Sequence, residues 1–388
     1  MPKRIIIDRA DRLYQMPRLT DAFYPQPPIL GGRKFGTLDL GRPNWVDADS
    51  RPKPREITAE ALGAAGQEQI GALQTAVAEW AARELGVKIN PEREVFVASG
   101  TCELLSLVGL AYLDPGDLAL YPNPGYPAYR QSILTYGAES VAYNLTEKRE
   151  FMPRLKQFSE HLGRAARAMF INNPHNPSGA ELDMEKLDEL LWLAARQNLL
   201  LINDAAYVAF SDCEDVSLMG SPSGRRIGLE FYSLTFLRVN GRLPVAFAIG
   251  AKDLIAGLRA AGHVRGTEVL RYRVDEAIEA LAEYPSAELH SLRSRIRDAW
   301  APAQELCQAL GLTAVSRQGF PYLLARLPKR TSSQSFAGTL MRRYGLVTLP
   351  GVAFGDLAEG YIRMALTNGP LPFQEALQRV KARKLRAG

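Results

Sequence analysis

The segment "AMFINNPHNPSG", residues 168–179, joins a short continuous apolar run to a turn rich in asparagine and proline. Such runs are typical of strands buried in a parallel sheet, because a half-exposed strand would alternate apolar and polar residues. The same pattern occurs elsewhere in the chain, at "EVFVAS" (94–99), "DLALYP" (117–122) and "LLLIND" (199–204). We therefore predict that these segments are buried strands of a central sheet.

Helical patterns separate these strands, as in "GTCELLSLVGLAYL" (100–113) and "DMEKLDELLWLAARQ" (183–197). This alternation of strands and helices predicts an α/β domain built in layers. Upstream, "QEQIGALQTAVAEWAARELG" (67–86) places apolar residues at helical spacing and ends at a glycine. After about residue 285, a long polar helix leads into short strands, which predicts a smaller α+β lobe.

We predict three parts of the chain on this basis. Residues 1–50 form an arm and part of the small domain, residues 51–285 form the large α/β domain, and residues 286–388 form the small C-terminal domain. A chain of 388 residues is too long for one compact core and long enough for two lobes.

The composition argues against several classes of function. Apolar residues make up 46% and charged residues 23% of the chain, as in an ordinary globular protein. The net charge of +5 is weak evidence for a polyanionic partner, so we expect no nucleic acid. The four histidines lack metal-ligand spacing and no run of 18 apolar residues occurs, so we expect no metal site and no membrane span. Three scattered cysteines and an N-terminus without a signal-peptide pattern predict a cytoplasmic protein.

Polar residues follow the ends of several predicted strands, where ligands bind in open α/β sheets. "ASGTCE" (98–103) opens a helix, and backbone N–H groups at a helix start form an anion site. "NDAAY" (203–207) places Asp204 and Tyr207 at the same edge of the sheet as "NNPHNPSG" (172–179). Each motif alone also has a purely structural explanation, as a tight turn, a proline-rich turn or a helix cap.

Taken together and in this order, the motifs resemble the class I/II aminotransferases, the fold type I enzymes that use pyridoxal phosphate (PLP). The resemblance runs from about residue 36 onward and includes "DPGD…YPNPGYPAY" (114–129), "GFPYLLARLP" (319–328) and "LPGVAFG…YIRMALT" (349–367). It implies a large domain with a mostly parallel central sheet flanked by helices, plus a smaller α+β domain. It also implies a homodimer that acts on a small molecule.

The resemblance assigns the cofactor's phosphate and one face of its ring to particular residues. Ser99, Gly100 and Thr101 match the turn that holds the phosphate. Tyr126 matches the aromatic residue that stacks on the pyridine ring.

Four further residues match the polar contacts of the ring and the substrate. Asn176 and Tyr207 match the pair that hydrogen-bonds the ring oxygen, and Asp204 matches the carboxylate that keeps the ring nitrogen protonated. Arg363 matches the arginine that binds the substrate's α-carboxylate as a bidentate fork.

The segment "FYSLTFLRVNGRLPVAFAIG", residues 231–250, departs from the family pattern of Ser-x-x-Lys with an arginine eight residues later. Ser233 keeps the phosphate-binding serine, but Phe236 occupies the lysine position and Pro244 the arginine position. A shifted alignment recovers Arg242 as a phosphate ligand and still lacks the lysine. No lysine occurs between Lys186 and Lys252 under either alignment.

Two other departures bear on the ligand. Residues 60–70 lack the tyrosine that in the family reaches the partner subunit's phosphate. "LGRPN" (40–44) places Arg42 and Pro43 where the family has a glycine beside the substrate, so we predict that Arg42 binds a second anion.

Three hypotheses follow, because loss of a positioned general base costs about 10²–10⁴ in rate. The first, favoured on the sequence alone, is an enzyme without a cofactor and unlike a conventional transaminase. It would bind an amino-acid-like carboxylate through Arg363, Asn176, Tyr126 and Arg42, with Asp204 pairing a cation or acting as base. In the second, PLP or its amine form, pyridoxamine phosphate (PMP), binds without a covalent bond and another base such as Tyr207 acts. In the third, the protein is a non-catalytic partner that binds a ligand or another protein.

Overall fold

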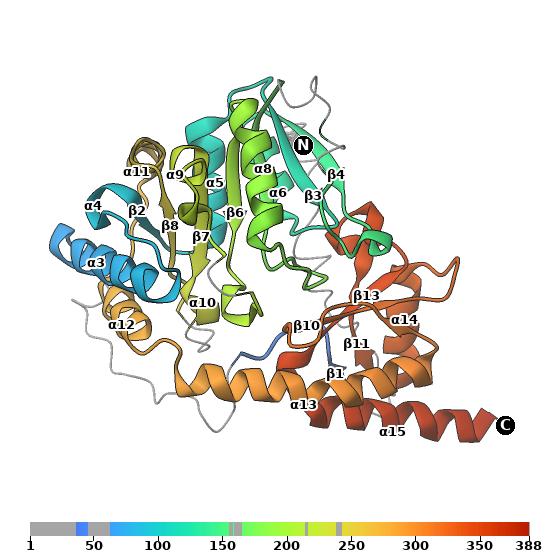
Figure 1. The fold of residues 1–388 in the computed structure, drawn as a ribbon. Helices are drawn as coiled ribbons and strands as arrows, with labels where there is room; N and C mark the ends of the chain where they lie inside the picture. The colour runs from blue at the N-terminus through green and yellow to red at the C-terminus, as the bar shows by residue number, and fades with distance from the viewer. Residues whose placement is uncertain are drawn as a thin grey trace, which may run out of the picture.

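The computed structural model describes residues 36–45, 63–154, 158, 165–213, 216–237 and 243–387. Within them the chain forms two lobes connected by a long helix (Figure 1). The larger lobe contains a seven-stranded sheet, and the smaller lobe contains a four-stranded and a two-stranded sheet. Most of the predicted arm lies outside the described residues, and the predicted domain boundaries stay predictions.

The central sheet has the strand order β2-β8-β7-β6-β5-β3-β4. Its strands are β2 (Val95–Ala98), β3 (Leu118–Asn123), β4 (Glu139–Asn144), β5 (Ala166–Asn172), β6 (Leu200–Asp204), β7 (Gly228–Ser233) and β8 (Ala246–Gly250). Every neighbouring pair is parallel except the two made by β8, which runs antiparallel to β2 and β7. The predicted α/β class with a mostly parallel central sheet is therefore confirmed.

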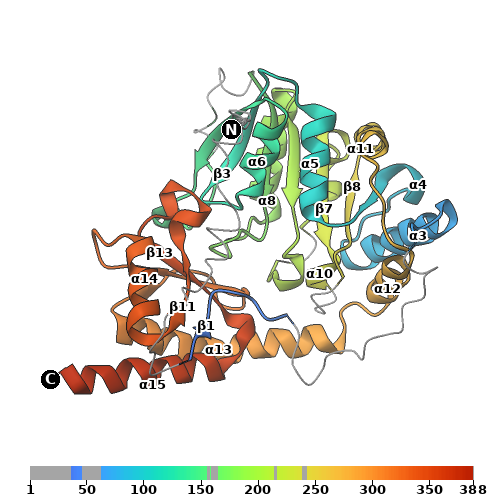
Figure 2. The ribbon, with the colours of Figure 1, turned by 180° about the vertical axis from the view of Figure 1, so that it is seen from behind.

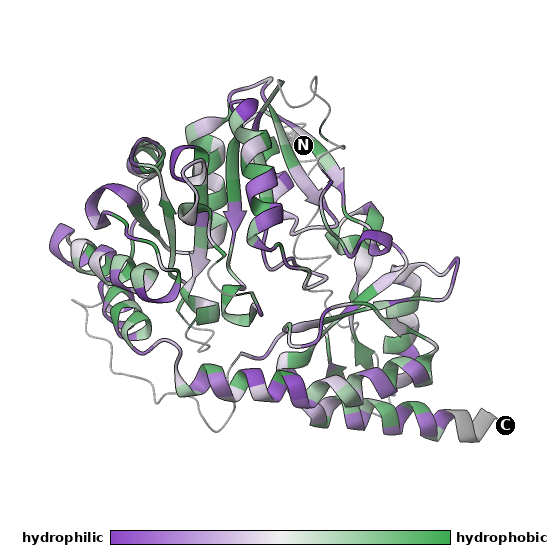
Figure 3. Cartoon of the chain, viewed as in Figure 1, coloured by the Kyte–Doolittle hydropathy of each residue, from purple (hydrophilic) through white to green (hydrophobic). Residues whose placement is uncertain are grey.

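Helices cover both faces of this sheet. The helices α5 (Thr101–Tyr112), α6 (Ala128–Thr135) and α11 (Lys252–Arg265) lie on one face, and α8 (Met184–Arg196) lies on the other (Figures 1 and 2). Inner strands such as β6 and β8 are hydrophobic along most of their length, whereas α8 carries a hydrophilic outer stripe (Figure 3). The buried residues of α8 recur at helical spacing, so one stripe of this helix faces the sheet: Leu187, Leu190, Leu191 and Ala194.

At the β2 end of the sheet, α3 (Gln67–Glu84) packs against α12 (Arg271–Ala282). Three short helices lie nearby in the same lobe: α4 (Pro91–Glu94), α9 (Gly224–Ile227) and α10 (Leu234–Leu237). The apolar positions predicted for residues 67–86 face the core, since Leu73, Val77 and Trp80 of α3 are fully buried.

Residues 231–250, whose sequence departs from the family pattern, contain two strand segments and a short helix. The strand segments are the end of β7 and the whole of β8, and α10 follows β7 without a break. Phe236 therefore lies on a helical turn at the strand end. Arg242 lies outside the described residues.

The smaller lobe lies around the C-terminal part of α13 (Ala287–Leu310). Its four-stranded antiparallel sheet has the order β12 (Leu349–Pro350), β13 (Tyr361–Ala365), β10 (Tyr322–Arg326) and β9 (Thr313–Ala314). In addition, β1 (Leu38–Asp39) pairs in parallel with β11 (Leu346–Val347). The helices α14 (Ser333–Tyr344) and α15 (Pro370–Ala387) complete the lobe, and α15 packs along α13. None of the helices in the described part of the chain is both long and apolar enough to cross a membrane.

Candidate active site

A cavity of about 180 Å³ lies where the ends of β5 and β6 face the smaller lobe. Residues from both lobes line it: Pro43, Trp45, Thr101, Tyr126, Tyr129, Asn172, Asn176, Asp204, Ala206, Tyr207, Phe236, Tyr322 and Arg363. Six of the residues singled out from the sequence for cofactor or substrate binding are among them, and Phe236 is as well. The parallel sheet brings the strand ends together, and β13 adds Arg363 from the smaller lobe.

Asp204 is a buried carboxylate at the end of β6. Its Oδ2 accepts a hydrogen bond from the Tyr129 hydroxyl at 2.6 Å, and its Oδ1 accepts one from the Ala206 N–H at 3.1 Å. Burial raises the pKa of Asp204, and these two hydrogen bonds lower it in part. The described residues provide no ion-pair partner for this carboxylate, so the position favours a cationic group of a ligand.

Arg363 is a buried cation on β13, with 4% of its surface exposed. Its Nη1 donates to Asn176 Oδ1 at 2.9 Å, and its guanidinium lies 3.7 Å from the ring centre of Tyr322 and 4.7 Å from that of Phe354. Its Nε is buried and has no hydrogen-bond partner among the described residues. A buried guanidinium with an unused donor is suited to a carboxylate ligand, which offers two oxygens to the fork.

Tyr207 contacts Tyr322, the residue whose ring lies beside Arg363. The Tyr207 hydroxyl lies 3.3 Å from that of Tyr322. Burial is the main cause that raises the pKa of Tyr207 well above its ordinary value, and Tyr322 raises it further. This tyrosine therefore keeps its proton at neutral pH and can act as a hydrogen-bond donor, and the role of Tyr207 as a base stays a prediction.

Tyr126 and Tyr129 form one wall of the cavity. Their ring centres are 5.9 Å apart and the ring planes are nearly perpendicular, at 81°. Burial and the neighbouring Asp204 raise the pKa of Tyr129, so its hydroxyl remains the donor to that carboxylate. Tyr129 lies in the quoted "PGYPAY" motif, but no pattern around it pointed to this role.

The turn predicted to bind phosphate lies at the start of α5. Thr101 lines the cavity, whereas Ser99 and Gly100 do not. The Ser99 N–H donates to Glu103 Oε2 and its hydroxyl donates to the Glu268 carbonyl, both at 2.7 Å. Gly100 has a φ of +152°, in the positive region that favours glycine, which explains why a residue without Cβ occupies this turn.

Phe236 occupies one side of the cavity with its ring. It stacks on Tyr207 with ring centres 4.7 Å apart, and Trp45 contacts it edge-on at 4.8 Å. Ser233, three residues earlier, is buried at the end of β7 and does not line the cavity. The sequence did not predict Trp45, which lies one residue beyond the quoted "LGRPN", or Tyr322, which lies in the quoted "GFPYLLARLP".

Arg42 is not among the residues that line the cavity, in contrast to the predicted second anion site. Its Nε lies 3.6 Å from Asp39 Oδ2, and its side chain is 48% exposed. The Arg42 N–H also donates to Asp39 Oδ1 at 3.0 Å, so the turn at Asp39 holds this residue. Pro43 and Trp45 contribute to the cavity instead.

A mostly parallel sheet whose strand ends place a buried acid opposite a buried arginine from a second lobe is the arrangement of the fold type I class. The family model described as aminotransferase class I and II matches residues 43–372, and the chain belongs to this family. The predicted resemblance to this family is thereby confirmed.

Among named relatives, LL-diaminopimelate aminotransferase of Dehalococcoides mccartyi is 31% identical over 334 residues, which cover 81% of this chain and 84% of that protein. Substrate-bound BacF from Bacillus subtilis superimposes with a TM-score of 0.86 at 26% identity, over 97% of this chain and 98% of that one. A probable N-succinyldiaminopimelate aminotransferase from Thermus thermophilus gives a TM-score of 0.77 at 26% identity, over 89% and 95% of the two chains.

These comparisons correct the sequence-based preference for an enzyme without a cofactor and without transaminase activity. The chain belongs to a family of PLP-dependent enzymes, and curated relatives about 31% identical to it are named as aminotransferases. Both findings point to PLP. The preference was wrong because it inferred loss of the cofactor from Phe236 at the position matched to the lysine, although the residues matched to the ring contacts include Asp204 on β6 and Asn176 in the turn after β5. The prediction of an enzyme is supported, since the relatives are enzymes.

Proposed function

We propose that the protein is an aminotransferase that binds PLP or PMP without a covalent bond and acts on an amino-acid-like carboxylate. The observation that carries this proposal is one cavity with two buried charges, the carboxylate of Asp204 and the guanidinium of Arg363. Neither has an ion-pair partner among the residues that the structure describes. The chain has no lysine between Lys186 and Lys252, and Phe236 lines the cavity at the position matched to the lysine.

The donors and acceptors present fit the cofactor. Asp204 would pair with the protonated ring nitrogen, and this cation would compensate the burial that raises the pKa of the carboxylate. Tyr207 and Asn176 would hold the ring oxygen, and Tyr126 would contact the ring. Thr101 at the start of α5 would face the phosphate. When bound, the cofactor supplies an electron sink for carbanionic character at the substrate carbon.

Arg363 would bind and orient the substrate's carboxylate. Asn176 holds one end of the guanidinium, and the rings of Tyr322 and Phe354 contact it. These contacts fix its rotamer before a ligand arrives, which reduces the ordering cost of binding. The unused Nε is one donor available to the carboxylate.

The rest of the described lining favours a substrate with an uncharged side chain. Arg363 and Asp204 are its only charged residues, and both are already assigned above. Pro43, Trp45 and Phe236 supply apolar surface beside them. Diaminopimelate, in the names of the relatives, carries a second amino and a second carboxyl group, whose burial without partners would cost free energy. We therefore expect a larger kcat/KM for an aromatic or aliphatic amino acid than for diaminopimelate.

The decisive experiment tests binding and covalent attachment separately. Purified protein is titrated with PLP and with PMP, and binding is followed by absorbance and by thermal unfolding. We expect binding of both that dialysis reverses, and no increase in chain mass after borohydride reduction of the PLP complex. The Phe236→Lys variant should retain the cofactor on residue 236 after the same reduction.

The outcomes separate the parts of the proposal. If neither PLP nor PMP binds at millimolar concentration, cofactor use is wrong. If borohydride fixes PLP on one lysine of the wild-type chain, non-covalent binding is wrong. Formation of an amino acid when PMP-loaded protein is mixed with a 2-oxo acid would directly demonstrate amino transfer.

A further inference from the structure

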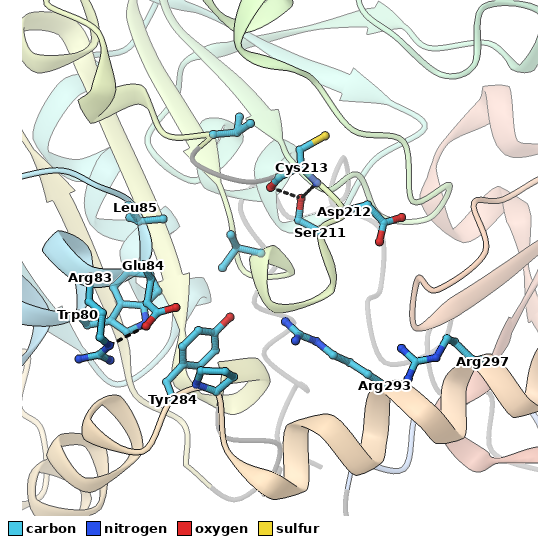
Figure 4. Close-up of a pocket in the computed structure, with 13 residues that line it drawn as sticks. Trp80, Arg83, Glu84, Leu85, Ser211, Asp212, Cys213, Tyr284, Arg293 and Arg297 are labelled. Atoms are coloured by element: carbon cyan, nitrogen blue, oxygen red, sulfur yellow. Dashed lines mark hydrogen bonds and ion pairs between the residues drawn. The ribbon is translucent and has the colours of Figure 1, made fainter.

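A second cavity, of about 470 Å³, lies outside the candidate active site, between the end of α3, the segment after β6 and the start of α13 (Figure 4). The segment after β6 includes the short 3-10 helix η3 (Val208–Phe210), which follows Tyr207 directly. Tyr207 lines the active-site cavity, whereas Val208 lines this second one. We call this cavity the α13 cleft.

Two arginines project from α13 into the cleft (Figure 4). Arg293 and Arg297 are four residues apart and therefore neighbours on one helix face. The Nε of Arg293 donates to the Ala209 carbonyl at 2.8 Å. The exposed Arg297 has no hydrogen-bond or ion-pair partner within the part of the chain that the structure describes. Like charges at this spacing repel by about 0.2–0.5 kcal/mol.

No acid one helical turn away offsets this pair. The neighbouring positions on the same face of α13 carry no carboxylate: Leu289, His290, Ser294, Ile296, Trp300 and Ala301. The acids that line the cleft within the described residues, Glu84 and Asp212, already have partners. Glu84 Oε1 lies 2.6 Å from Arg83 Nε, and Asp212 pairs with Arg317.

The interior of the cleft adds hydrogen-bond donors. Trp80 is 1% exposed, and its Nε1, which can only donate, is buried without a partner among the described residues. The Tyr284 hydroxyl points toward the guanidinium of Arg293 (Figure 4). Burial raises the pKa of Tyr284, with Arg293 lowering it in part, so the hydroxyl keeps its proton as a donor. Two guanidinium groups, an unused indole N–H and a phenol thus give the described lining of the cleft an excess of donors.

We propose that the α13 cleft binds a small anion that carries a phosphate group, bound by Arg293 and Arg297. A planar guanidinium fork matches phosphate oxygens bidentately, and two forks on successive helical turns suit a dianion. Trp80 would donate from the interior of the cleft. The bound anion would link α13 to the segment after β6, which begins directly after Asp204 and includes Tyr207. The cleft is thus a ligand site separate from the active-site cavity.

Inorganic phosphate is the probe for the test. Thermal unfolding and calorimetric titration are run with sodium phosphate and with sodium chloride at matched ionic strength. Wild-type protein should bind phosphate saturably, and its melting temperature should rise by mass action. Arg297→Gln should weaken the phosphate affinity by about tenfold or more, because it removes a charge-assisted contact. Since Arg297 is exposed and makes no contact that stabilises the described fold, this variant should melt normally without phosphate.

Arg226→Gln is the matched control, because Arg226 is an exposed arginine on α9 that does not line the cleft. It should bind phosphate as the wild type does. Trp80→Phe should keep the ring packing and weaken phosphate binding by a few-fold. Equal affinity in the wild type and Arg297→Gln would place phosphate elsewhere and overturn the proposal. A chloride effect as large as the phosphate effect would also overturn it, as non-specific screening.

Discussion

The active-site cavity has two sides that differ in what they can offer a ligand. The β6 and β13 side carries buried charges, whereas the α10 side carries an apolar ring. On the first side, Asp204 and Arg363 are buried charges fixed by Tyr129, Asn176 and Tyr322. On the α10 side, the ring of Phe236 packs against aromatic neighbours and needs no polar partner. Buried charges cost free energy unless a ligand or partner compensates them, whereas a packed phenyl ring does not. Under the proposed function, the residues that would recognise the cofactor and the position matched to the family's lysine therefore lie on separate elements.

Substitution of Asp204 is expected to have the largest effect on activity. Asp204→Asn keeps an acceptor for Tyr129 but removes the charge that would pair with a ring cation. We expect kcat/KM to fall by about 10²–10³, the usual effect of removing a preorganised charged partner. Steady-state kinetics with saturating PLP measures this loss.

Glu230→Gln is the matched control for Asp204→Asn. Glu230 is a fully buried carboxylate on the neighbouring strand β7 that bonds Asn203 and Ser217 and does not line the cavity. Its substitution should change stability and leave kcat/KM within a few-fold of the wild type. Equal losses in both variants would mean that Asp204 acts only through the fold.

The next largest effect should come from Arg363. Arg363→Ala removes the charge-assisted contacts to a carboxylate, each worth about 1.5–3 kcal/mol, so we expect KM for the amino acid to rise by at least tenfold. Arg363→Lys keeps the positive charge but loses the bidentate guanidinium. Its KM should therefore lie between the KM of the wild type and that of Arg363→Ala. Tyr322→Phe, which keeps the ring beside Arg363, should stay close to the wild type. A normal KM in Arg363→Ala would show that the carboxylate binds elsewhere.

Much of this fold follows from local patterns, because buried parallel strands are short apolar runs that end in polar turns. The strand ends carrying Asp204 and Asn176 were predicted to meet for this reason. The direction of β8 was not predicted, since it depends on how β8 pairs with β2 and β7. Tyr129 and Trp45 escaped notice because their roles appear only when α6 and the first strand of the smaller lobe reach the cavity. Arg42 was expected to face the ligand, but it pairs with Asp39 instead, and this pairing depends on local turn geometry that the sequence does not show.

A smaller effect concerns the pH dependence of stability without cofactor. Burial raises the pKa of Asp204 above 3.8, its ordinary value. Between the unfolded and folded pKa values the folded chain binds more protons, so the free energy of unfolding falls as pH rises through this window. Asp204→Asn removes this contribution and should therefore gain stability relative to the wild type as pH rises from 3.8. Urea unfolding of both proteins across this range measures the difference, and a constant difference at every pH would contradict the prediction.

The smallest effect tests the α10 side. Phe236→Leu replaces the ring with a shorter apolar side chain and removes its stacking on Tyr207. A loss of about 0.5–1.5 kcal/mol in the free energy of unfolding is expected, the usual worth of an aromatic pair. Because the ring offers no polar contact, affinity for PLP and kcat/KM should both remain within a few-fold of the wild type. A large loss of cofactor affinity in Phe236→Leu would instead show that the phenyl ring holds the cofactor by contact. The α10 side would then take part in recognition, and the contrast between the two sides of the cavity would no longer hold.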